Sequence, residues 1–463
     1  MLTATNRLTT AITATDPIFA ALRQKEFGRL DENRLAYLDY TGSALPAARQ
    51  LQAHTELLDR GVYGNPHADN EPSRRSTQAL DAGRALLLAH LEADAAEYVV
   101  CFSANATGAV KLVAESYPFT RESGYVLSAD NHNSLNGVRE YARRAGARIA
   151  YVPLDAQLRL DGSSDVLGRF RAARGPRLFA FPAQSNFSGV RHPLELIETA
   201  QDAGFEVLVD AAAFLPSCGL SLRAHRPEFV VLSFYKLFGV PTGLGALVAR
   251  RDALARLRRP WFSGGTIEYV SVQNDVHSLL PAAGGFEDGT PHFLGAAALA
   301  SGFDLLAEVG MARLSAHIGG LTNELLVALR CITYRDGAPA AQIYGPTGSA
   351  GRGGTVAFNV LDRHGRVVPY WVVEERARAR GVAVRGGCFC NPGAAEAAFG
   401  FDGESAARCL RVASEGGFTI PQFAECMTRD AGVAVGAVRA SLGLANNDAD
   451  VRRAVEVVES FVQ

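Results

Sequence analysis

Between about residue 80 and residue 250, short apolar runs alternate with longer amphipathic stretches. The apolar runs are EYVVCF, SGYVLSA, RLFAFPA, FEVLVDAAA and FVVLSF. This alternation is typical of α/β folds, in which each helix carries the chain back across a parallel sheet. The sequence therefore predicts an α/β fold with a mainly parallel sheet. Because open sheets of this kind bind ligands outside the carboxyl ends of their strands, the residues that follow each run are candidate site residues.

The pattern changes past roughly residue 290. A long helical segment is followed by the loop YGPTGSAGRGG, the apolar run TVAFNVL, another helix and the Gly-rich stretch RGGCFCNPG. A chain of 463 residues is long enough for more than one core. We predict a helix and arm at residues 1–35, a large domain at 36–295 and a smaller α+β domain at 296–463.

Composition narrows the class of partner. The formal net charge is only -2, and no Lys/Arg run stands out, so we expect neither nucleic acid nor a membrane surface as partner. No apolar stretch approaches the roughly 20 residues of a membrane span, and the first residues lack a signal-peptide core, which predicts a cytoplasmic protein. The seven cysteines are scattered, and we expect reduced thiols rather than disulfides. A small-molecule substrate is favoured.

Lysine is rare in this chain. Of 46 basic residues only Lys25, Lys111 and Lys236 are lysines, and arginine cannot supply the neutral amine that a Schiff base requires. Lys25 and Lys111 lie in helical patterns. Lys236 follows an apolar run and precedes the Gly-rich loop GVPTGLG, where poor solvation would lower its pKa and make it a nucleophile. The alternative is a lysine that merely extends to solvent at the end of a strand.

Asp210 closes the run FEVLVD, 26 residues before Lys236. A carboxylate beside a pyridine nitrogen keeps that nitrogen protonated, which is what pyridoxal 5'-phosphate (PLP) needs in order to withdraw electrons. Alone, such an aspartate is commonly a cap or turn residue, but together with Lys236 it indicates a PLP site. A phosphate would suit the helix start at SANATGAV, with Ala106 and Thr107, and the hydroxyl of Ser233.

Segments in the same order resemble the class V aminotransferases, within them the cysteine desulfurases, and especially the desulfurase domain of molybdenum cofactor sulfurases. They are YLDYTGSALP, YGNPHA, FSANATGAVKLVAESYPF, DNHNSLNGVR, PAQSNFSGVRHPL, VDAAAFLP, SFYKLFGVPTGLGALV, FEDGT, VRGGCFCNPGA and GAVRASLG. The resemblance implies the fold of type I PLP enzymes, with a seven-stranded sheet in the large domain. It also implies a homodimer whose active site lies at the subunit interface.

The resemblance assigns roles around the cofactor. Lys236 matches the Schiff-base lysine and Asp210 the partner of the pyridine nitrogen. Ala106, Thr107 and Ser233 match phosphate contacts, and Asn186 matches the residue near the phenolic oxygen. Gly265 and Thr266 resemble the phosphate contact that the partner subunit provides. His132 resembles the catalytic ring that stacks on the cofactor, but its spacing to Arg139 is one residue short, so Asn131 is the alternative.

The substrate side is also carried over from the resemblance. Arg439 matches the arginine that binds the substrate carboxylate through two parallel hydrogen bonds. Arg385 and Tyr40 are further substrate-binding candidates. Cys390 lies five residues after Arg385, where desulfurases carry the cysteine that becomes a persulfide, and Arg385 would favour its thiolate form. A zinc half-site with Cys388 is the alternative, but no second pair follows at ligand spacing, and we predict no metal.

The resemblance thus predicts a PLP-dependent desulfurase that takes sulfur from L-cysteine or a cysteine derivative. A Cys390 persulfide would form, alanine would leave, and a separate protein or molecule would accept the sulfur. The alternatives are a C–S lyase, an epimerase or an aminotransferase of the same family, and a catalytically silent scaffold. Ala213 and Tyr235 depart from the family pattern, since many desulfurases carry glutamine and histidine there.

Overall fold

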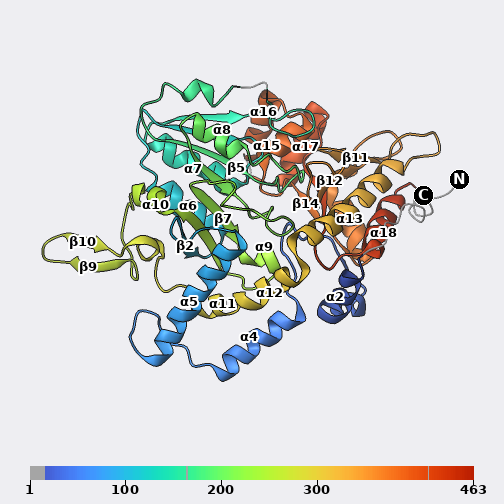
Figure 1. Cartoon of the computed structure of the whole chain (residues 1–463). Helices are drawn as coiled ribbons and strands as arrows, with labels where there is room; N and C mark the ends of the chain where they lie inside the picture. Colours follow the sequence, from blue (N-terminus) through green and yellow to red (C-terminus); the bar gives the residue numbers. More distant parts are fainter. Residues whose placement is uncertain (1–15, 163–164, 415–416, 463) are drawn as a thin grey trace.

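The computed structural model describes residues 16–162, 165–414 and 417–462. Seven strands form its central sheet, in the order β2-β8-β7-β6-β5-β3-β4 (Figure 1). Only β8 runs antiparallel to its neighbours in this sheet. The predicted mainly parallel, seven-stranded sheet is confirmed. Its strands are β2 (Tyr98–Ser103), β3 (Gly124–Ser128), β4 (Arg148–Val152), β5 (Arg177–Pro182), β6 (Glu206–Asp210), β7 (Phe229–Ser233) and β8 (Gly245–Arg250).

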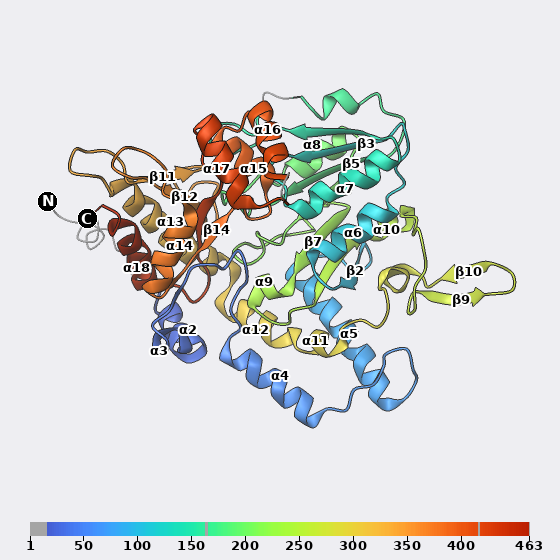
Figure 2. The ribbon, with the colours of Figure 1, turned by 180° about the vertical axis from the view of Figure 1, so that it is seen from behind.

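The strands are apolar on both faces because helices cover both faces. Along β7, Phe229 and Val231 point into one core, while Val230 and Leu232 point into the other. The two faces are visible in Figures 1 and 2. The first core is closed by α6 (Ala106–Ser116), α7 (Asn133–Arg144) and α10 (Arg251–Arg256), and the second by α5 (Glu71–His90), α8 (Leu196–Asp202), α11 (Phe293–Ala297) and α12 (Leu299–Val309).

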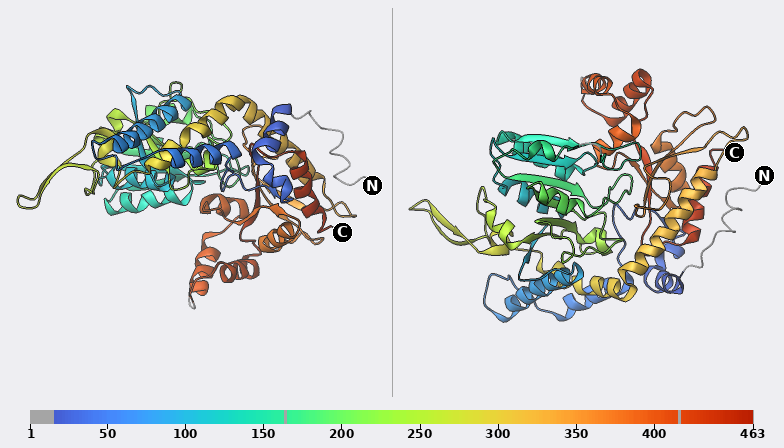
Figure 3. Two further views of the ribbon diagram at one scale, coloured as in Figure 1. Left: turned by 90° about the horizontal axis from the view of Figure 1, so that it is seen from below. Right: turned by 45° about the horizontal axis from the view of Figure 1, so that its top comes forward.

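A second sheet carries the C-terminal part of the chain. Its four strands are antiparallel, in the order β11-β12-β15-β14. Apolar side chains of three helices pack with this sheet in one core, and Figure 3 shows them beside it. The strands are β11 (Ala341–Tyr344), β12 (Thr355–Val360), β14 (Arg385–Gly387) and β15 (Ala437–Ser441), and the helices are α13 (Met311–Cys331), α14 (Tyr370–Ala379) and α18 (Asp448–Glu459).

The chain passes from one part to the other between α12 and α13. Helix α12 packs on α5 of the large part, whereas α13 packs on β11 and α18 of the small part. Between the two helices stands Gly310, with a φ of 78° that favours glycine. The predicted boundary at residues 295 and 296 stays a prediction, since α11 and α12 both pack on α5.

The N-terminal segment lies against the small part. Helix α2 (Pro17–Phe27) carries Arg23, whose guanidinium binds Asp450 at 2.6 Å and the carbonyl oxygen of Ala445. Strand β1 (Ala36–Tyr37) then pairs in parallel with β13 (Val382–Ala383). These contacts anchor the chain just before Asp39 and Tyr40. Of the predicted arm at residues 1–35, residues 1–15 lie outside the described residues.

Two hairpins project from the body of the molecule (Figures 1 and 3). One is the arm formed by β9 (Ile267–Ser271) and β10 (Val276–Leu279). The other pairs α16 (Gly403–Ser414) with α17 (Ile420–Ala431), and a disulfide joins Cys409 to Cys426 between them.

The expectation that all thiols are reduced is therefore wrong for Cys409 and Cys426. Packing of α16 on α17 brings the two cysteines together in a small buried cluster with Met427, although 17 positions separate them in sequence. A count of scattered cysteines carries no information about that packing.

None of the described helices is by itself long and apolar enough to cross a bilayer. The consecutive helical segments Phe293–Val309 and Met311–Cys331 are bent by 73° at the break between them. Taken together they are long and apolar enough to cross a bilayer, by length and composition only. Many side chains of this pair belong to the protein core.

Candidate active site

A pocket opens at the carboxyl ends of β5, β6 and β7, where an open α/β sheet is expected to bind its ligand. It holds about 670 Å³ of empty space, counting the part open to solvent. Most of the residues predicted to bind the cofactor line it together: Ala106, Thr107, His132, Asn186, Asp210, Ser233 and Lys236. The order of the strands thus brings side chains that lie up to 130 positions apart in the sequence into one cavity.

Lys236 lies on α9 (Phe234–Phe238), a short helix that begins directly after β7. Gly239 ends this helix with a φ of 88°, and a Cβ there would lie 2.2 Å from the backbone nitrogen of Pro46. Burial lowers the pKa of Lys236, and the negative charge of Asp210 partly opposes this effect. The neutral amine is the nucleophilic form, so the site favours the state that a Schiff base requires.

Asp210 is the last residue of β6 and is buried. Its Oδ1 accepts a hydrogen bond of 2.9 Å from the backbone N–H of Ala212, which fixes the carboxyl group. Burial lowers the pKa of Lys236 and of His132, and the charge of Asp210 partly offsets this lowering for both. Asp210 and Lys236 therefore face one cavity, as the sequence predicts for an acid and an amine that share a ligand.

The start of α6 forms a polar cradle at one end of the pocket. Asn105 caps the helix by accepting a hydrogen bond from Gly108 N–H, and Ala106 N–H donates to Ser233 Oγ at 2.8 Å. The hydroxyl of Thr107 lies 2.7 Å from that of Ser134. Hydroxyls at the positive end of an 11-residue helix suit a phosphate group. Ser134 is a member of this cradle that the sequence interpretation missed.

The structure places the adjacent side chains of His132 and Asn131 in different surroundings. His132 lines the pocket, and its Nδ1 accepts a hydrogen bond from Ser134 N–H at the start of α7. Burial lowers the pKa of His132, and the charge of Asp210 opposes this only in part, so the neutral ring is favoured. Asn131 is fully buried and donates to the carbonyl oxygens of Ser128 and Ala180. The geometry favours His132 as the residue that stacks on a ligand.

Asn186 joins the pocket to the loop that carries Cys390. Its Nδ2 donates to the carbonyl oxygen of Phe389 at 2.7 Å, and its Oδ1 accepts from Asn391 at 2.9 Å. Asn133 N–H donates to the carbonyl oxygen of Cys390 at 2.8 Å. The backbone around Cys390 is thus attached to the pocket wall, while the side chain of Cys390 is exposed.

The cations predicted to bind substrate share one carboxylate. Asp39 accepts hydrogen bonds from Arg385 at 2.6 Å and from Arg439 at 2.9 Å. Arg439 is buried, its NH1 donates to the carbonyl oxygen of Asn186, and its Nε has no partner among the described residues. Burial lowers the pKa of Arg439, against the opposing charge of Asp39. The sequence interpretation missed Asp39, although it stands in the quoted segment YLDYTGSALP.

Cys390 lies within electrostatic reach of the cations of this site. It interacts electrostatically with Lys236, Arg385 and Arg439, although burial and the carboxylates of Asp39 and Asp210 have larger effects on these groups. Cys388 differs, because burial raises the pKa of its thiol to about 11 and keeps it protonated. The exposed thiol of Cys390 is therefore the better placed nucleophile of the two.

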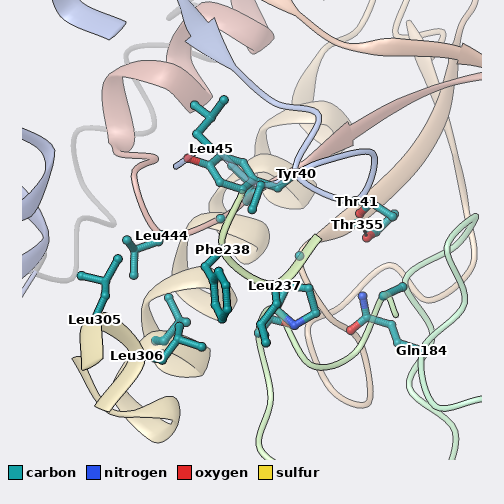
Figure 4. A pocket seen from close by; sticks show the side chains of 18 of the residues that line it. Tyr40, Thr41, Leu45, Gln184, Leu237, Phe238, Leu305, Leu306, Thr355 and Leu444 are labelled. Carbon is teal, nitrogen blue, oxygen red and sulfur yellow. Dashed lines mark hydrogen bonds between the residues drawn. The ribbon is translucent and has the colours of Figure 1, made fainter. Parts of the chain in front are cut away.

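Tyr40 lies apart from the cofactor pocket. It lines a second, mainly apolar pocket between the two parts of the molecule (Figure 4). The same pocket is lined by Leu45, Phe238, Leu305 and Leu306. At its far side the hydroxyl of Thr41 is hydrogen-bonded to that of Thr355. Gln184 and Ala213 line both pockets. Its neighbour Asp39 binds Arg385 and Arg439, whereas the side chain of Tyr40 lines the second pocket, and the role of Tyr40 in substrate binding stays a prediction.

Gly265 and Thr266 also lie outside the pocket of their own chain. Gly265 has a φ of 83° and packs beside His67 and the carbonyl oxygen of Gly289. Thr266 is buried and donates to the carbonyl oxygen of Ser263. Both stand at the base of the β9–β10 arm. A contact with the cofactor of a second subunit is still a prediction for this pair.

One group of metal-ligand type occurs among the described residues, namely Cys409, Cys426 and Asp430. Its two sulfur atoms are joined in the disulfide, and its carboxylate binds Arg429 and Arg408. Cys388 and Cys390 belong to no such group within the described part of the chain.

Comparison with known proteins establishes the family. The sequence profile of the family described as Aminotransferase class-V matches residues 36–454. The chain belongs to the class V aminotransferases. It is 35% identical over 414 residues to the molybdenum cofactor sulfurase of Bos taurus and 36% identical over 409 residues to that of Homo sapiens. These alignments cover 84% and 83% of this chain but 46% and 45% of the relatives, so the chain spans about half of their length.

Solved structures share the fold. A cysteine desulfurase from Thermococcus onnurineus superimposes with a TM-score of 0.76 at 24% identity, covering 98% of this chain and 99% of that one. A cysteine desulfurase from Escherichia coli gives a TM-score of 0.75 at 21% identity, covering 96% and 98%. The predicted fold of type I PLP enzymes is confirmed.

Class V aminotransferases are PLP enzymes, and the residues present fit this cofactor. The amine of Lys236 is buried and favoured in its neutral form, and Asp210 faces the same cavity. The hydroxyls of Thr107, Ser134 and Ser233 gather at the N-terminus of α6, where a phosphate would be bound. The predicted cofactor is therefore retained, and the individual contacts remain predictions.

Proposed function

We propose that this chain is a cysteine desulfurase that moves the sulfur of L-cysteine, or of a cysteine derivative, onto Cys390 and releases alanine. One observation carries the proposal. The buried amine of Lys236 lines the pocket, and the loop that carries the exposed thiol of Cys390 is hydrogen-bonded to the pocket wall through Asn186. An amine that can move a proton and a thiol that can accept a sulfur atom are the two groups that this reaction needs.

PLP bound in the pocket would withdraw electrons from the α carbon of the substrate. The chain supplies the remaining chemistry. Lys236, as a neutral amine, would remove the α proton and later return a proton to carbon. The carboxylate of Asp210 would hold a proton on the ring nitrogen, and the neutral imidazole of His132 would cover the ring.

Arg439 and Arg385 would orient the substrate carboxylate, which must compete with Asp39 for them. The Sγ of Cys390 would then attack the substrate sulfur. The S–S bond forms as the bond between Cβ and sulfur breaks, and the electron pair of the broken bond stays with Cβ, which takes up a proton. Cysteine and the Cys390 thiol are thereby converted into alanine and a Cys390 persulfide.

The first experiment mixes the purified, PLP-loaded protein with L-cysteine and a thiol reductant. Sulfide, alanine, pyruvate and ammonia are then quantified together. We expect sulfide and alanine in equal amounts. Sulfide with pyruvate and ammonia would identify a C–S lyase instead, and an absence of turnover would direct the search to epimerisation or transamination of other amino acids.

Cys390→Ser tests the role of the thiol. We expect sulfide production to be lost while the visible absorbance of the bound cofactor is retained. Cys331→Ser is a matched control, because Cys331 is also a free and exposed cysteine but lies at the end of α13. If the unmodified protein, saturated with PLP, shows no visible absorbance from bound cofactor, a catalytically silent scaffold is supported instead.

The curated relatives suggest the first acceptor to test. They are named for the molybdenum cofactor, so we propose that the persulfide sulfur passes to that molecule or to a separate protein that carries it. Incubating the protein with labelled cysteine and the desulfo form of the cofactor would show labelled sulfur in the cofactor. Label that stays on Cys390 would contradict this acceptor.

We also propose a homodimer, supported by the β9–β10 arm. The arm exposes large apolar side chains, among them Val272, which is 97% exposed, Tyr269 and Val276. An apolar surface on a projecting hairpin is typical of an interaction site. Sedimentation analysis should show a dimer that Val272→Asp weakens, whereas the control Asp275→Asn on the same hairpin should leave it intact.

A further inference from the structure

Cys390 has an unusual backbone conformation. Phe389 and Cys390 both have a φ of 56°, so two successive residues with side chains occupy the left-handed region. L residues with a Cβ are disfavoured there, and such conformations persist only where the surroundings hold them. The hydrogen bonds around the loop show what holds this one.

Asn391 is connected to every part of that arrangement. Its Nδ2 donates to the carbonyl oxygen of Asp130 at 2.6 Å and to Asn186 Oδ1 at 2.9 Å. Its Oδ1 accepts from Ala394 N–H and caps α15 (Pro392–Phe399), and its own N–H donates to the carbonyl oxygen of Cys388. Asn391 is fully buried, so no water replaces these bonds if they are lost.

The loop is held on its other sides as well. Asn186, which Asn391 orients, donates to the carbonyl oxygen of Phe389, and Asn133 N–H donates to that of Cys390. The guanidinium of Arg439 lies 4.7 Å from the centre of the Phe389 ring. The backbone of Cys390 is therefore fixed from both neighbours and from its own carbonyl group, although its side chain is exposed.

We propose that Asn391 is a positioning residue that holds Cys390 in the left-handed conformation and so presents its thiol to the pocket. This rests on the proposed function of Cys390 as the sulfur-accepting nucleophile. Asn391 touches neither the cofactor pocket nor the substrate cations in this structure, and it acts through Asn186 and the backbone. The thiol is thus delivered by a fixed turn and not by a swinging loop.

Asn391→Asp is the sharpest test, because the change is isosteric. Aspartate can still cap α15 at Ala394, but it cannot donate to Asp130 or Asn186, and its charge would oppose their oxygen atoms. We expect hydrogen exchange in the peptide spanning residues 386–399 to become at least about tenfold faster. Exchange in β7 and β8 should not change. Thr419→Ala is the matched control, since Thr419 caps the neighbouring helix α17 without touching the loop.

Two further readouts separate positioning from a general loss of structure. The kcat for cysteine should fall roughly tenfold, with KM and cofactor absorbance unchanged, as expected when only the approach of the thiol is disturbed. The rate of alkylation of Cys390, measured relative to Cys331 in the same chain, should also change. Asn391→Ser, which keeps a capping hydroxyl but cannot reach Asp130, is the second variant if the aspartate prevents folding.

The outcomes are distinguishable. Unchanged exchange and unchanged relative alkylation in both variants would overturn the positioning role. Faster exchange, combined with full sulfide production by Cys390→Ser, would leave the positioning role standing and refute the proposed function. Faster exchange with a loss of kcat confined to the Asn391 variants supports both.

Discussion

The site has two walls that the chain builds differently. The cofactor wall, formed by Ala106, Thr107, Asp210, Ser233 and Lys236, comes from strand ends and helix starts of one sheet. The thiol wall, formed by Asp39, Arg385, Cys390 and Arg439, joins segments that lie up to 400 positions apart. The first is fixed by local geometry, and the second by ion pairs and side-chain amides. We therefore expect changes to the cofactor wall to affect chemistry, and changes to the thiol wall to affect stability and alignment as well.

The largest effect is expected on the cofactor wall. Lys236→Ala removes the amine that would move the substrate proton in the proposed reaction, and we expect the turnover of cysteine to fall by at least about 10³-fold. The visible absorbance that arises from cofactor bound to the lysine should disappear as well. Lys111→Ala, on the exposed face of α6, is the control. Turnover within tenfold of the unmodified protein would mean that another group moves the proton.

Asp39→Asn tests the thiol wall. It removes the carboxylate from Arg439, whose side chain is 3% exposed, and a buried cation left unpaired should destabilise the fold by about 3 kcal/mol. Arg385→Ala should change stability by less than about 1 kcal/mol, because that side chain is 50% exposed. Denaturant unfolding of the two variants measures the difference. Equal losses would show that burial does not distinguish the two ion pairs.

The Cys409–Cys426 disulfide lies on the α16–α17 hairpin beside the thiol wall. Removing it tests how far the thiol wall depends on this hairpin. Closing a loop of 17 residues contributes about 3 kcal/mol in the chain-entropy account. Cys409→Ser should therefore lower the unfolding temperature, while the affinity for PLP stays unchanged. Cys331→Ser should have no effect on either quantity. A loss of PLP affinity in Cys409→Ser would mean that the hairpin supports the cofactor wall too.

The smallest effect is a shift in pH dependence. Asp210 raises the pKa of Lys236 by stabilising the ammonium form, against the larger lowering by burial. Asp210→Asn should lower this pKa further, so more neutral amine is present at a given pH. The initial rate at which the apoprotein takes up PLP should then reach its maximum at lower pH. Asp202→Asn, which changes an exposed carboxylate at the end of α8, is a surface control, and a shift to higher pH would contradict the assignment.

The cofactor wall could be predicted from sequence because its signals are local. Apolar runs that end in Asp210 and Ser233 specify strand ends, and parallel strands place those ends at one edge of a sheet. The start of α6 has a capping residue and small side chains in a continuous stretch. Ser134 was missed because a serine near a helix start is common and its meaning depends on the neighbouring strand.

The thiol wall could be predicted only in part. The resemblance to a family indicates Arg385, Cys390 and Arg439, but no periodicity connects them to Asp39. The left-handed turn is formed by Phe389 and Cys390, and neither is a glycine, so no local sequence preference predicts it. The Cys409–Cys426 disulfide was missed for the same reason, because it depends on the packing of two helices.

Asp39 is an internal counter-ion for the two arginines of the site. A ligand that is merely anionic has to displace that carboxylate from the arginines, and it gains little by doing so. Under the proposed function, an amino acid would bring a carboxylate for the arginines and an amino group for the cofactor, and the second attachment would offset the cost of displacing Asp39. The carboxylate of Asp39 would therefore favour ligands that carry both groups over simple anions.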